Sequence, residues 1–250
     1  MKKIKLIALS ALAFVTIAST VFVSCQKQQE FVENSQSTTT NTTQAKLTKD
    51  QKLAIGWVDL AAGVASIETG PASLVISAAA SMAYYQDKHA SEGWNAKNTY
   101  NPNNYPSTTN NPGELHNLIC EMYIQNGYTT VNYNDIKTVA LNVKPDLESS
   151  LNNMSEAQFN YFVNLTKDKD LSTPTNQLDF FKTYFSINQN DEVVLLNYLE
   201  TINNTDNEER ISKIDDLINR IQSFDLDNTQ KINLTNSFQI LKHSSILWQH

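Results

Sequence analysis

The sequence predicts an all-α protein, a bundle of about eight helices around a small-residue helical hairpin, behind a signal peptide and a tether. Three observations lead to this prediction. Apolar residues recur at helical spacing through most of the chain after Thr48, and helix-starting patterns precede many of these runs. No segment sustains the alternation of apolar and polar residues that is typical of a strand. The 250 residues are enough for one large domain or two small ones.

The first 24 residues predict a lipoprotein signal peptide. The chain begins Met-Lys-Lys-Ile-Lys and continues with an apolar run that ends at Val23. The segment Phe22-Val23-Ser24-Cys25 resembles a bacterial lipobox, although Phe22 replaces the usual Leu. Cleavage would leave Cys25 as the residue that receives lipid such as palmitate, and a lipid holds a protein to a bilayer without a spanning helix. Plain secretion and an uncleaved anchor are the alternatives.

Residues 25–47 predict the lipidated cysteine and a flexible tether. This stretch is rich in Ser, Thr, Asn and Gln and lacks apolar periodicity, so it cannot bury a core. A coil of this length averages roughly 25 Å from end to end. Residues 48–250 then form the all-α domain, which could divide into a hairpin at 48–92 and a helical part at 112–250. Residues 93–111, rich in Asn, Pro, Tyr and Thr, predict the loop between them.

Helix-starting patterns mark many of the expected helices. Two capping boxes are predicted, at Thr48 with Gln51 and at Ser155 with Gln158. Pro71, Pro112 and Pro174 suit the first position of a helix. The expected helices start, in chain order, near Thr48, Pro71, Pro112, Asn134, Ser155, Thr173, Asp191 and Thr205, with Thr205 and Glu208 as a further cap, and a last helix carries Leu234, Phe238, Leu241 and Trp248. Only residues 128–133 could be extended.

The stretch from Gly56 to Tyr85 is the least polar part of the domain and carries only two charges, Asp59 and Glu68. It predicts two helices with small-residue stripes, which allow close approach of neighbouring helices. Neither helix has a broad charged face, so both must be covered. The charges leave the first helix too short to span a bilayer. We therefore expect a core hairpin, with an oligomer seam or a membrane-active hairpin as the alternatives.

Charge and cysteine content narrow the choice of partners. The formal net charge of −7 becomes −10 once the three signal-peptide lysines are removed, so binding to nucleic acid is not expected. If Cys25 carries lipid, Cys120 has no partner for a disulfide, and no Cys or His spacing is typical of a metal site. No phosphate-binding glycine-rich loop or nucleophile elbow occurs, and no cofactor is predicted.

The strongest chemical candidates lie near the start of the helix that follows Pro112. His116 and Cys120 are four residues apart, so they share a helix face, as a nucleophile and its base would. Glu114 and Asn117 could complete a catalytic or binding site, or could simply serve the first turn of the helix. A buried thiol beside polar capping residues is the simpler interpretation.

Three aromatic residues of the loop, Trp94, Tyr100 and Tyr105, could stack on a sugar or peptide, or could hold the loop in place.

One resemblance comes from the order of these parts: a small-residue hairpin, an Asn-Pro loop, and then Gly113-Glu-Leu-His-Asn at a helix start. This order is similar to a group of uncharacterised secreted proteins and lipoproteins of Bacteroidota-type bacteria, in which a glycine-rich hairpin precedes a Gly-x-x-His-Asn element. The hairpin here has more Ala and Ser than glycine. The resemblance covers about Leu53 to Leu118 and brings no established activity with it.

The sequence therefore predicts a lipid-anchored protein of the bacterial cell envelope, at the periplasmic or surface face of the outer membrane. A non-enzymatic binding or interaction module for a protein or small molecule is the expected role, and the protein could form oligomers. A membrane-active or toxin-like protein that uses residues 56–85 is the first alternative. An enzyme with a site centred on His116 is the second.

Overall fold

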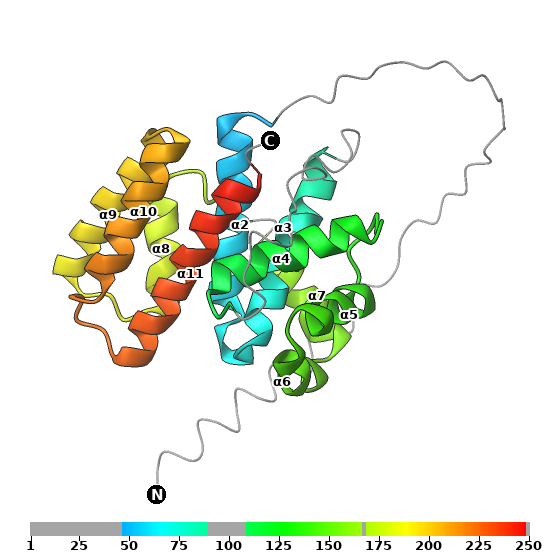
Figure 1. Ribbon diagram of the computed structural model, residues 1–250. Helices are drawn as coiled ribbons and strands as arrows, with labels where there is room; N and C mark the ends of the chain where they lie inside the picture. Colours follow the sequence, from blue (N-terminus) through cyan, green and yellow to red (C-terminus); the bar gives the residue numbers. More distant parts are fainter. Residues whose placement is uncertain (1–46, 90–108, 167–168, 249–250) are drawn as a thin grey trace, which may run out of the picture. The chain divides into compact units, whose positions relative to one another are not determined.

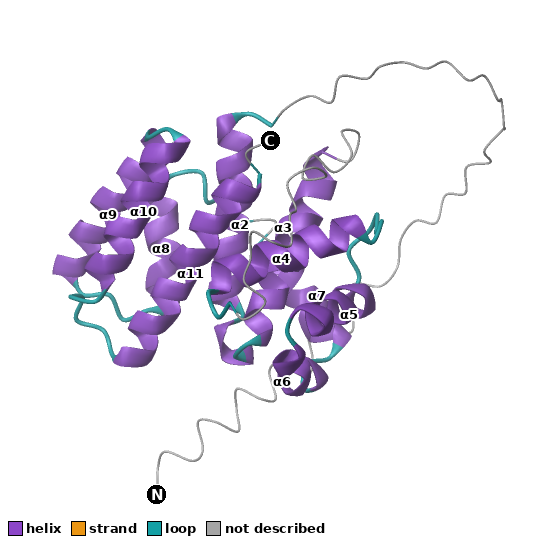
Figure 2. Ribbon diagram, viewed as in Figure 1, coloured by secondary structure: helices purple, strands orange, loops and turns teal. Residues whose placement is uncertain are grey.

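The computed structural model describes residues 47–89, 109–166 and 169–248, which fold into α-helices and two 3₁₀ turns without a strand (Figures 1 and 2). The all-α prediction is therefore confirmed for this part of the chain. The signal peptide, Cys25, most of the tether and the loop residues Trp94, Tyr100 and Tyr105 lie outside the described residues. The helices are α2 (Lys49–Ala65), α3 (Ala72–His89), α4 (Pro112–Gln125), α5 (Tyr133–Val143), α6 (Glu148–Asn152), α7 (Glu156–Leu165), α8 (Pro174–Tyr184), α9 (Gln189–Asn204), α10 (Asn207–Ile221) and α11 (Asn228–Leu247).

Ten α-helices in the described residues exceed the expected eight. One reason is α6, a helix of five residues that is too short to show apolar periodicity in the sequence. The 3₁₀ turns are η1 (Ile67–Thr69) and η4 (Pro145–Leu147). Of residues 128–133, which could have been extended, 128–132 form no strand and Tyr133 begins α5.

The helix-starting patterns account for several boundaries. Thr48 Oγ1 accepts a hydrogen bond from the Gln51 N–H, and the Gln51 side chain accepts one from the Thr48 N–H, so this capping box is confirmed. Ser155 and Gln158 repeat the arrangement at α7. Before α4, the Asn111 side chain accepts from two backbone N–H groups and Pro112 follows at the first helical position.

One predicted cap is wrong. Helix α10 starts after Asp206, whereas Thr205 belongs to the C-terminal end of α9. The Asp206 carboxylate makes no cap hydrogen bond, and it lies 3.0 Å from Lys49 Nζ on α2, with which it forms an ion pair.

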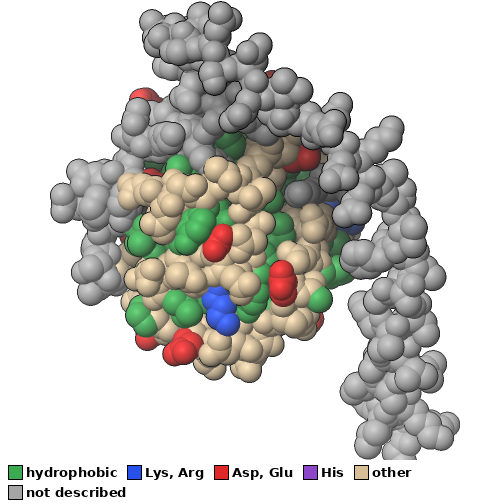
Figure 3. Space-filling model, turned by 90° about the vertical axis from the view of Figure 1, so that its right-hand side faces the viewer, with side chains coloured by type: hydrophobic (Ala, Val, Ile, Leu, Met, Phe, Trp, Pro, Cys, Tyr) green, Lys and Arg blue, Asp and Glu red, His purple; other side chains and the backbone are tan. Residues whose placement is uncertain are grey.

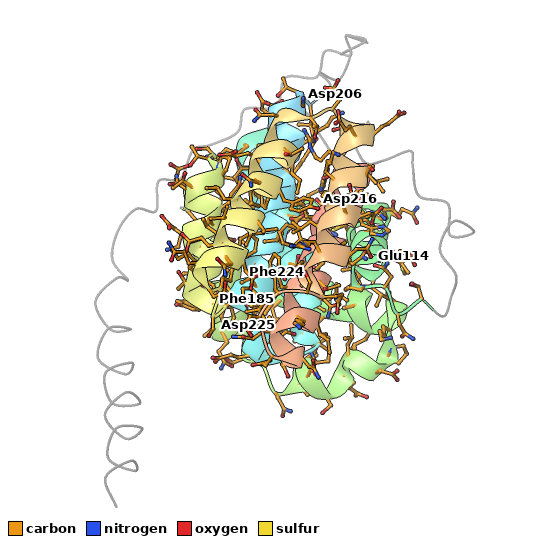
Figure 4. The ribbon with its side chains drawn as sticks, turned by 90° about the vertical axis from the view of Figure 1, so that its left-hand side faces the viewer. Glu114, Phe185, Asp206, Asp216, Phe224 and Asp225 are labelled. Atoms are coloured by element: carbon orange, nitrogen blue, oxygen red, sulfur yellow. The ribbon has the colours of Figure 1, made fainter. Side chains whose placement is uncertain are left out.

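The buried apolar residues form two clusters. The small-residue cluster fills the space among α2, α3, α4, α5 and α7 and contains seven buried alanines: Ala62, Ala72, Ala78, Ala79, Ala80, Ala83 and Ala140. The large-residue cluster fills the space among α2, α8, α9, α10 and α11 with leucine, isoleucine and phenylalanine. Phe185 and Phe224, both members of it, lie toward one end of these helices, and Asp206 lies at the other (Figure 4).

Helices α2 and α11 contribute to both clusters and pack against each other. Small residues on α2 make this contact close. A Cβ atom added at Gly56 would lie 2.9 Å from Leu241 Cδ1, and one at Gly63 would lie 3.4 Å from Ile240 Cδ1. The small stripe of the hairpin therefore faces α11 as well as α3, and the chain itself covers the hairpin.

The turn of the hairpin contains Gly70, whose φ of 62° is a conformation that glycine adopts readily. Among the described residues, none of the helices combines the length and the apolar character needed to cross a bilayer. On the face of the molecule turned toward the viewer in Figure 3, apolar side chains form small separate groups among backbone and uncharged polar atoms, and few charged side chains are visible.

Candidate functional site

The predicted pair His116 and Cys120 lies on the inner side of α4. Both side chains are completely buried, and His116 Nε2 is 4.0 Å from Cys120 Sγ. The Cys120 thiol also lies 3.7 Å from the Ala78 carbonyl oxygen on α3, to which it donates. The structure therefore brings the two residues together, as the helical spacing predicts.

The other two predicted residues, Asn117 and Glu114, differ in burial. Asn117 is buried beside His116, and its Oδ1 lies 3.1 Å from His116 Nδ1. Glu114 points toward the segment before α4, where its carboxylate accepts a hydrogen bond from the Thr109 hydroxyl. Glu114 is partly exposed and is not part of the buried group.

A residue from α2 completes this buried group. Asp59 is completely buried, and its Oδ2 lies 3.4 Å from His116 Nε2. The same oxygen accepts a hydrogen bond from the Ser244 hydroxyl of α11. The backbone oxygen of Asp59 accepts from Ser77 Oγ on α3, at 2.7 Å. We call Asp59, His116, Asn117, Cys120 and Ser244 the polar core; it joins α2, α4 and α11.

Burial dominates the electrostatics of the polar core. It raises the pKa of Asp59 well above its usual value, while hydroxyl groups of Ser244 and Ser81 act in the opposite direction. It lowers the pKa of His116 to about 4. Burial therefore favours the neutral form of each group, and His116 is neutral at neutral pH.

The same arrangement limits what the polar core can do chemically. Burial raises the pKa of the Cys120 thiol, and the nearby acidic groups Asp59 and Glu121 raise it further. A cysteine nucleophile reacts as the thiolate and must meet its substrate. Cys120 is a buried thiol in an environment that favours the protonated form. Among residues 47–89, 109–166 and 169–248, no group of three or more His, Cys, Asp or Glu side chains has the arrangement to hold a metal ion.

A cavity lies elsewhere in the fold. It is a groove of about 640 Å³ at the end of the helices where α2 and α8 begin and α3 and α9 end. We call it the α2–α8 groove. The residues that line it are Asp50, Leu53, Ala54, Trp57, Val58, Tyr84, Lys88, Lys169, Asp170, Leu171, Ser172, Thr173, Pro174, Asn203 and Asn204.

Trp57 gives the α2–α8 groove its most unusual feature. The side chain is 3% exposed, and its indole N–H has no hydrogen-bond partner among the described residues. A buried donor that lacks an acceptor costs roughly 1–3 kcal/mol, and such groups are few in folded proteins. Among the described residues a second buried indole, that of Trp248, donates to Ser81 Oγ at 3.2 Å. The lining therefore includes apolar side chains and one residue whose buried donor lacks an acceptor among the described residues.

Charges at the α2–α8 groove are balanced, with two lysines, Lys88 and Lys169, and two aspartates, Asp50 and Asp170. Asp170 is already occupied, because it accepts hydrogen bonds from Ser172 and Asn176. These bonds lower the pKa of Asp170, so it stays ionised at neutral pH. The lining favours a ligand without a large net charge.

Comparison of the chain with known protein families, with curated proteins and with solved structures found no match.

Sequence reasoning missed Asp59 as a site residue and missed the α2–α8 groove. A signal for Asp59 was present, since it is one of only two charges in the stretch 56–85 and lies on a stripe of small residues. The groove had no comparable signal, because its walls come from four separate parts of the chain.

Proposed function

We propose that this protein is a lipid-anchored binding module of the bacterial envelope, related to the Bacteroidota-type secreted lipoproteins that it resembles. Cys25 would carry the lipid and residues 26–47 would act as the tether, at the outer membrane. The α2–α8 groove would hold the ligand. The buried Trp57 indole N–H without an acceptor is the observation that carries the binding role.

The groove suggests the class of ligand. Leu53, Val58 and Leu171 supply apolar wall, and Trp57 supplies a hydrogen-bond donor. The volume of about 640 Å³ is within the range of small-molecule sites. A small amphiphilic molecule with an apolar body and a carbonyl-type acceptor suits these features, and the balanced lysines and aspartates favour one without net charge.

The state of the polar core supports binding over catalysis. His116 and Cys120 are both completely buried, and the thiol is held in its protonated form. The packing of α2 and α3 supports a binding module over a membrane-active protein. Insertion of this hairpin would require it to leave α4, α7 and α11.

The anchor is tested with the variant Cys25→Ala. We expect the wild-type protein to incorporate labelled palmitate and to fractionate with membranes, and the variant to do neither. A variant that stays with membranes would show that Cys25 is not the anchor.

The groove is tested with Nile red, an uncharged apolar dye with a carbonyl acceptor, added to Cys25→Ala protein in detergent-free buffer. We expect saturable fluorescence enhancement that weakens about tenfold in affinity when Trp57→Phe removes the indole donor, since a buried hydrogen bond contributes about 1.4 kcal/mol. Trp248→Phe is the matched control, because it removes an indole N–H outside the groove. Equal dye binding by both variants would contradict a ligand site at Trp57.

A further inference from the structure

The polar core fixes the position of a proton on His116. Asn117 Nδ2 donates to the His243 carbonyl oxygen at 2.8 Å, so the amide oxygen Oδ1 must be the atom that faces the imidazole. Asn117 Oδ1 lies 3.1 Å from His116 Nδ1. An amide oxygen only accepts hydrogen bonds, so Nδ1 must carry a hydrogen. In the neutral imidazole the other nitrogen, Nε2, then presents a lone pair.

That lone pair faces a carboxyl group. His116 Nε2 lies 3.4 Å from Asp59 Oδ2, and both groups are completely buried. If both were unprotonated at these atoms, an unshared pair would face a buried negative charge with no donor between them. One proton between the two groups removes this conflict. The proton can sit on the carboxyl, which leaves two neutral groups, or on Nε2, which creates a buried ion pair.

The surroundings favour the neutral pair. The Cys120 thiol on α4 stays protonated, and Ser77 and Ser81 on α3 and Ser244 on α11 present uncharged hydroxyls.

Two other titratable groups lie near: Glu121 on α4, whose burial raises its pKa to about 7, and His243 on α11, whose burial lowers its pKa. Glu114, Lys242 and Asp215 act on His243. A buried ion pair would need several compensating hydrogen bonds, and Asp59 Oδ1 has no partner among the described residues.

We propose that Asp59 and His116 form a proton-binding site: in the folded protein, Asp59 carries one proton and donates a hydrogen bond to Nε2 of His116. This hydrogen bond helps to hold α2 and α4 together, and Ser244 of α11 donates to the same carboxyl group. The site is distinct from the α2–α8 groove, and the proposal does not depend on the proposed function.

The site makes stability depend on pH in a specific way. In the unfolded chain, the aspartate loses its proton near pH 3.9 and the histidine near pH 6.5. The folded pair keeps one proton through this range, and the unfolded chain also holds one, on the histidine. The pair therefore makes the free energy of unfolding neither rise nor fall with pH between pH 4 and 6.5. Above pH 6.5 the unfolded chain holds none, so unfolding releases a proton.

The direction in which each group changes stability with pH follows from the direction of its pKa shift. The raised pKa of Asp59 gives a contribution that is complete below pH 3.9 and is lost as pH rises toward the folded pKa. The lowered pKa of His116 gives a contribution that is complete above pH 6.5 and is lost as pH falls toward about 4. Between pH 4 and 6.5 the two slopes cancel. Above pH 6.5 only the Asp59 contribution still changes, so the unfolding constant rises with pH, by up to tenfold per pH unit while the folded chain keeps the Asp59 proton.

The test compares urea unfolding of the full chain carrying Cys25→Ala with the same chain carrying also Asp59→Asn, from pH 4.5 to 8.5. The asparagine amide can donate to Nε2 and copies the protonated carboxyl. We expect the unfolding constant of the chain with Asp59, divided by that of the Asp59→Asn variant, to rise with pH from pH 4.5, by up to tenfold per pH unit while the folded chain keeps the Asp59 proton. Glu121 and His243 are present in both chains and cancel in the ratio. A ratio that stays constant would overturn the proposal.

A second measurement keeps the proposal testable if Asp59→Asn does not fold. Nitrogen chemical shifts of the His116 ring, measured by NMR in the otherwise unaltered chain, report both ring atoms. We expect Nδ1 to be protonated and Nε2 unprotonated from pH 5 to 8. A ring that titrates near pH 6.5, or an Nε2 that stays protonated, would contradict the proposal.

Discussion

In the large-residue cluster, phenylalanine and leucine side chains fill the space between the C-terminal helices, and Phe181 and Phe238 lie 5.4 Å apart by ring centroids. In the small-residue cluster, seven alanines lie among larger residues such as Tyr85 and Trp248, and some helices approach each other closely enough for short polar side chains to meet. Asp59 on α2 reaches Ser244 on α11 in this way.

The position of the buried polar groups differs accordingly. In the large-residue cluster they lie at helix ends, where Arg210 donates to the carbonyl oxygens of Ile202 and Thr205. In the other region, Asp59 and His116 lie between α2, α4 and α11. The comparison teaches that large side chains keep helices apart and push polar groups to the edge. Small ones bring backbones together and allow a polar group in the middle.

The strongest way to break the large-residue cluster is Phe238→Ala, because Phe238 is completely buried. We expect a loss of about 4 kcal/mol in the free energy of unfolding, measured by urea titration, from lost apolar burial and the cavity left behind. Ile232→Ala on the same helix is the control, since Ile232 is 58% exposed. Similar losses in both variants would argue against the described packing of α11.

Removal of Arg210 should have the next largest effect. Its guanidinium donates to Ile202 O, Thr205 O and Asn207 Oδ1, at 2.8–3.1 Å. Arg210→Ala leaves these acceptors without a donor, and we expect a loss of about 3 kcal/mol by the same measurement. Arg220→Ala, at an exposed position on the same helix, should change stability little. An equal effect of the two changes would mean that the three bonds contribute nothing.

The small-residue region should be sensitive to enlargement instead. A Cβ atom at Gly113 would lie 2.3 Å from the backbone oxygen of Gln239, so Gly113→Ala must push α4 away from α11. We expect thermal unfolding to show a loss of about 2 kcal/mol. Gly63→Ala is the matched change, because its nearest neighbour would be a flexible side-chain carbon at 3.4 Å. A protein that tolerates both equally would not have this close helix contact.

The smallest effect concerns helix ends. Ser155→Ala removes one side of the capping box at α7, and we expect a loss of about 1 kcal/mol. Asp206→Ala removes a residue without a cap hydrogen bond and with an exposed ion pair, so its cost should be a few tenths of a kcal/mol. Chemical denaturation can rank the two, and the reverse order would contradict the assignment of these caps.

The sequence allowed local features to be predicted better than tertiary ones. The starts of α2, α4 and α7 follow from patterns within four residues. The sequence also indicated that other residues must cover both helices of the hairpin. The sequence did not indicate which helix provides this cover, because Ser244 of α11 lies 185 residues from Asp59. No periodicity within one helix indicates which distant helix will meet it.

The candidate site shows the same division. The spacing of His116 and Cys120 placed them together, as the structure does. Their environment could not be predicted, because burial decides which proton each group holds and burial depends on α2, α3 and α11. Asp59 lies beside His116 only because those helices pack together in the fold.

The place of α11 in both clusters also bears on the order of events during synthesis. Every other described helix precedes α11 in the chain, so the ribosome completes all of them before the residues that join the two clusters exist. Before α11 docks, Gly56 and Gly63 lack the neighbour that they fit. Both clusters therefore lack one of their walls until α11 has emerged, so the compact domain should form only after that helix has been made.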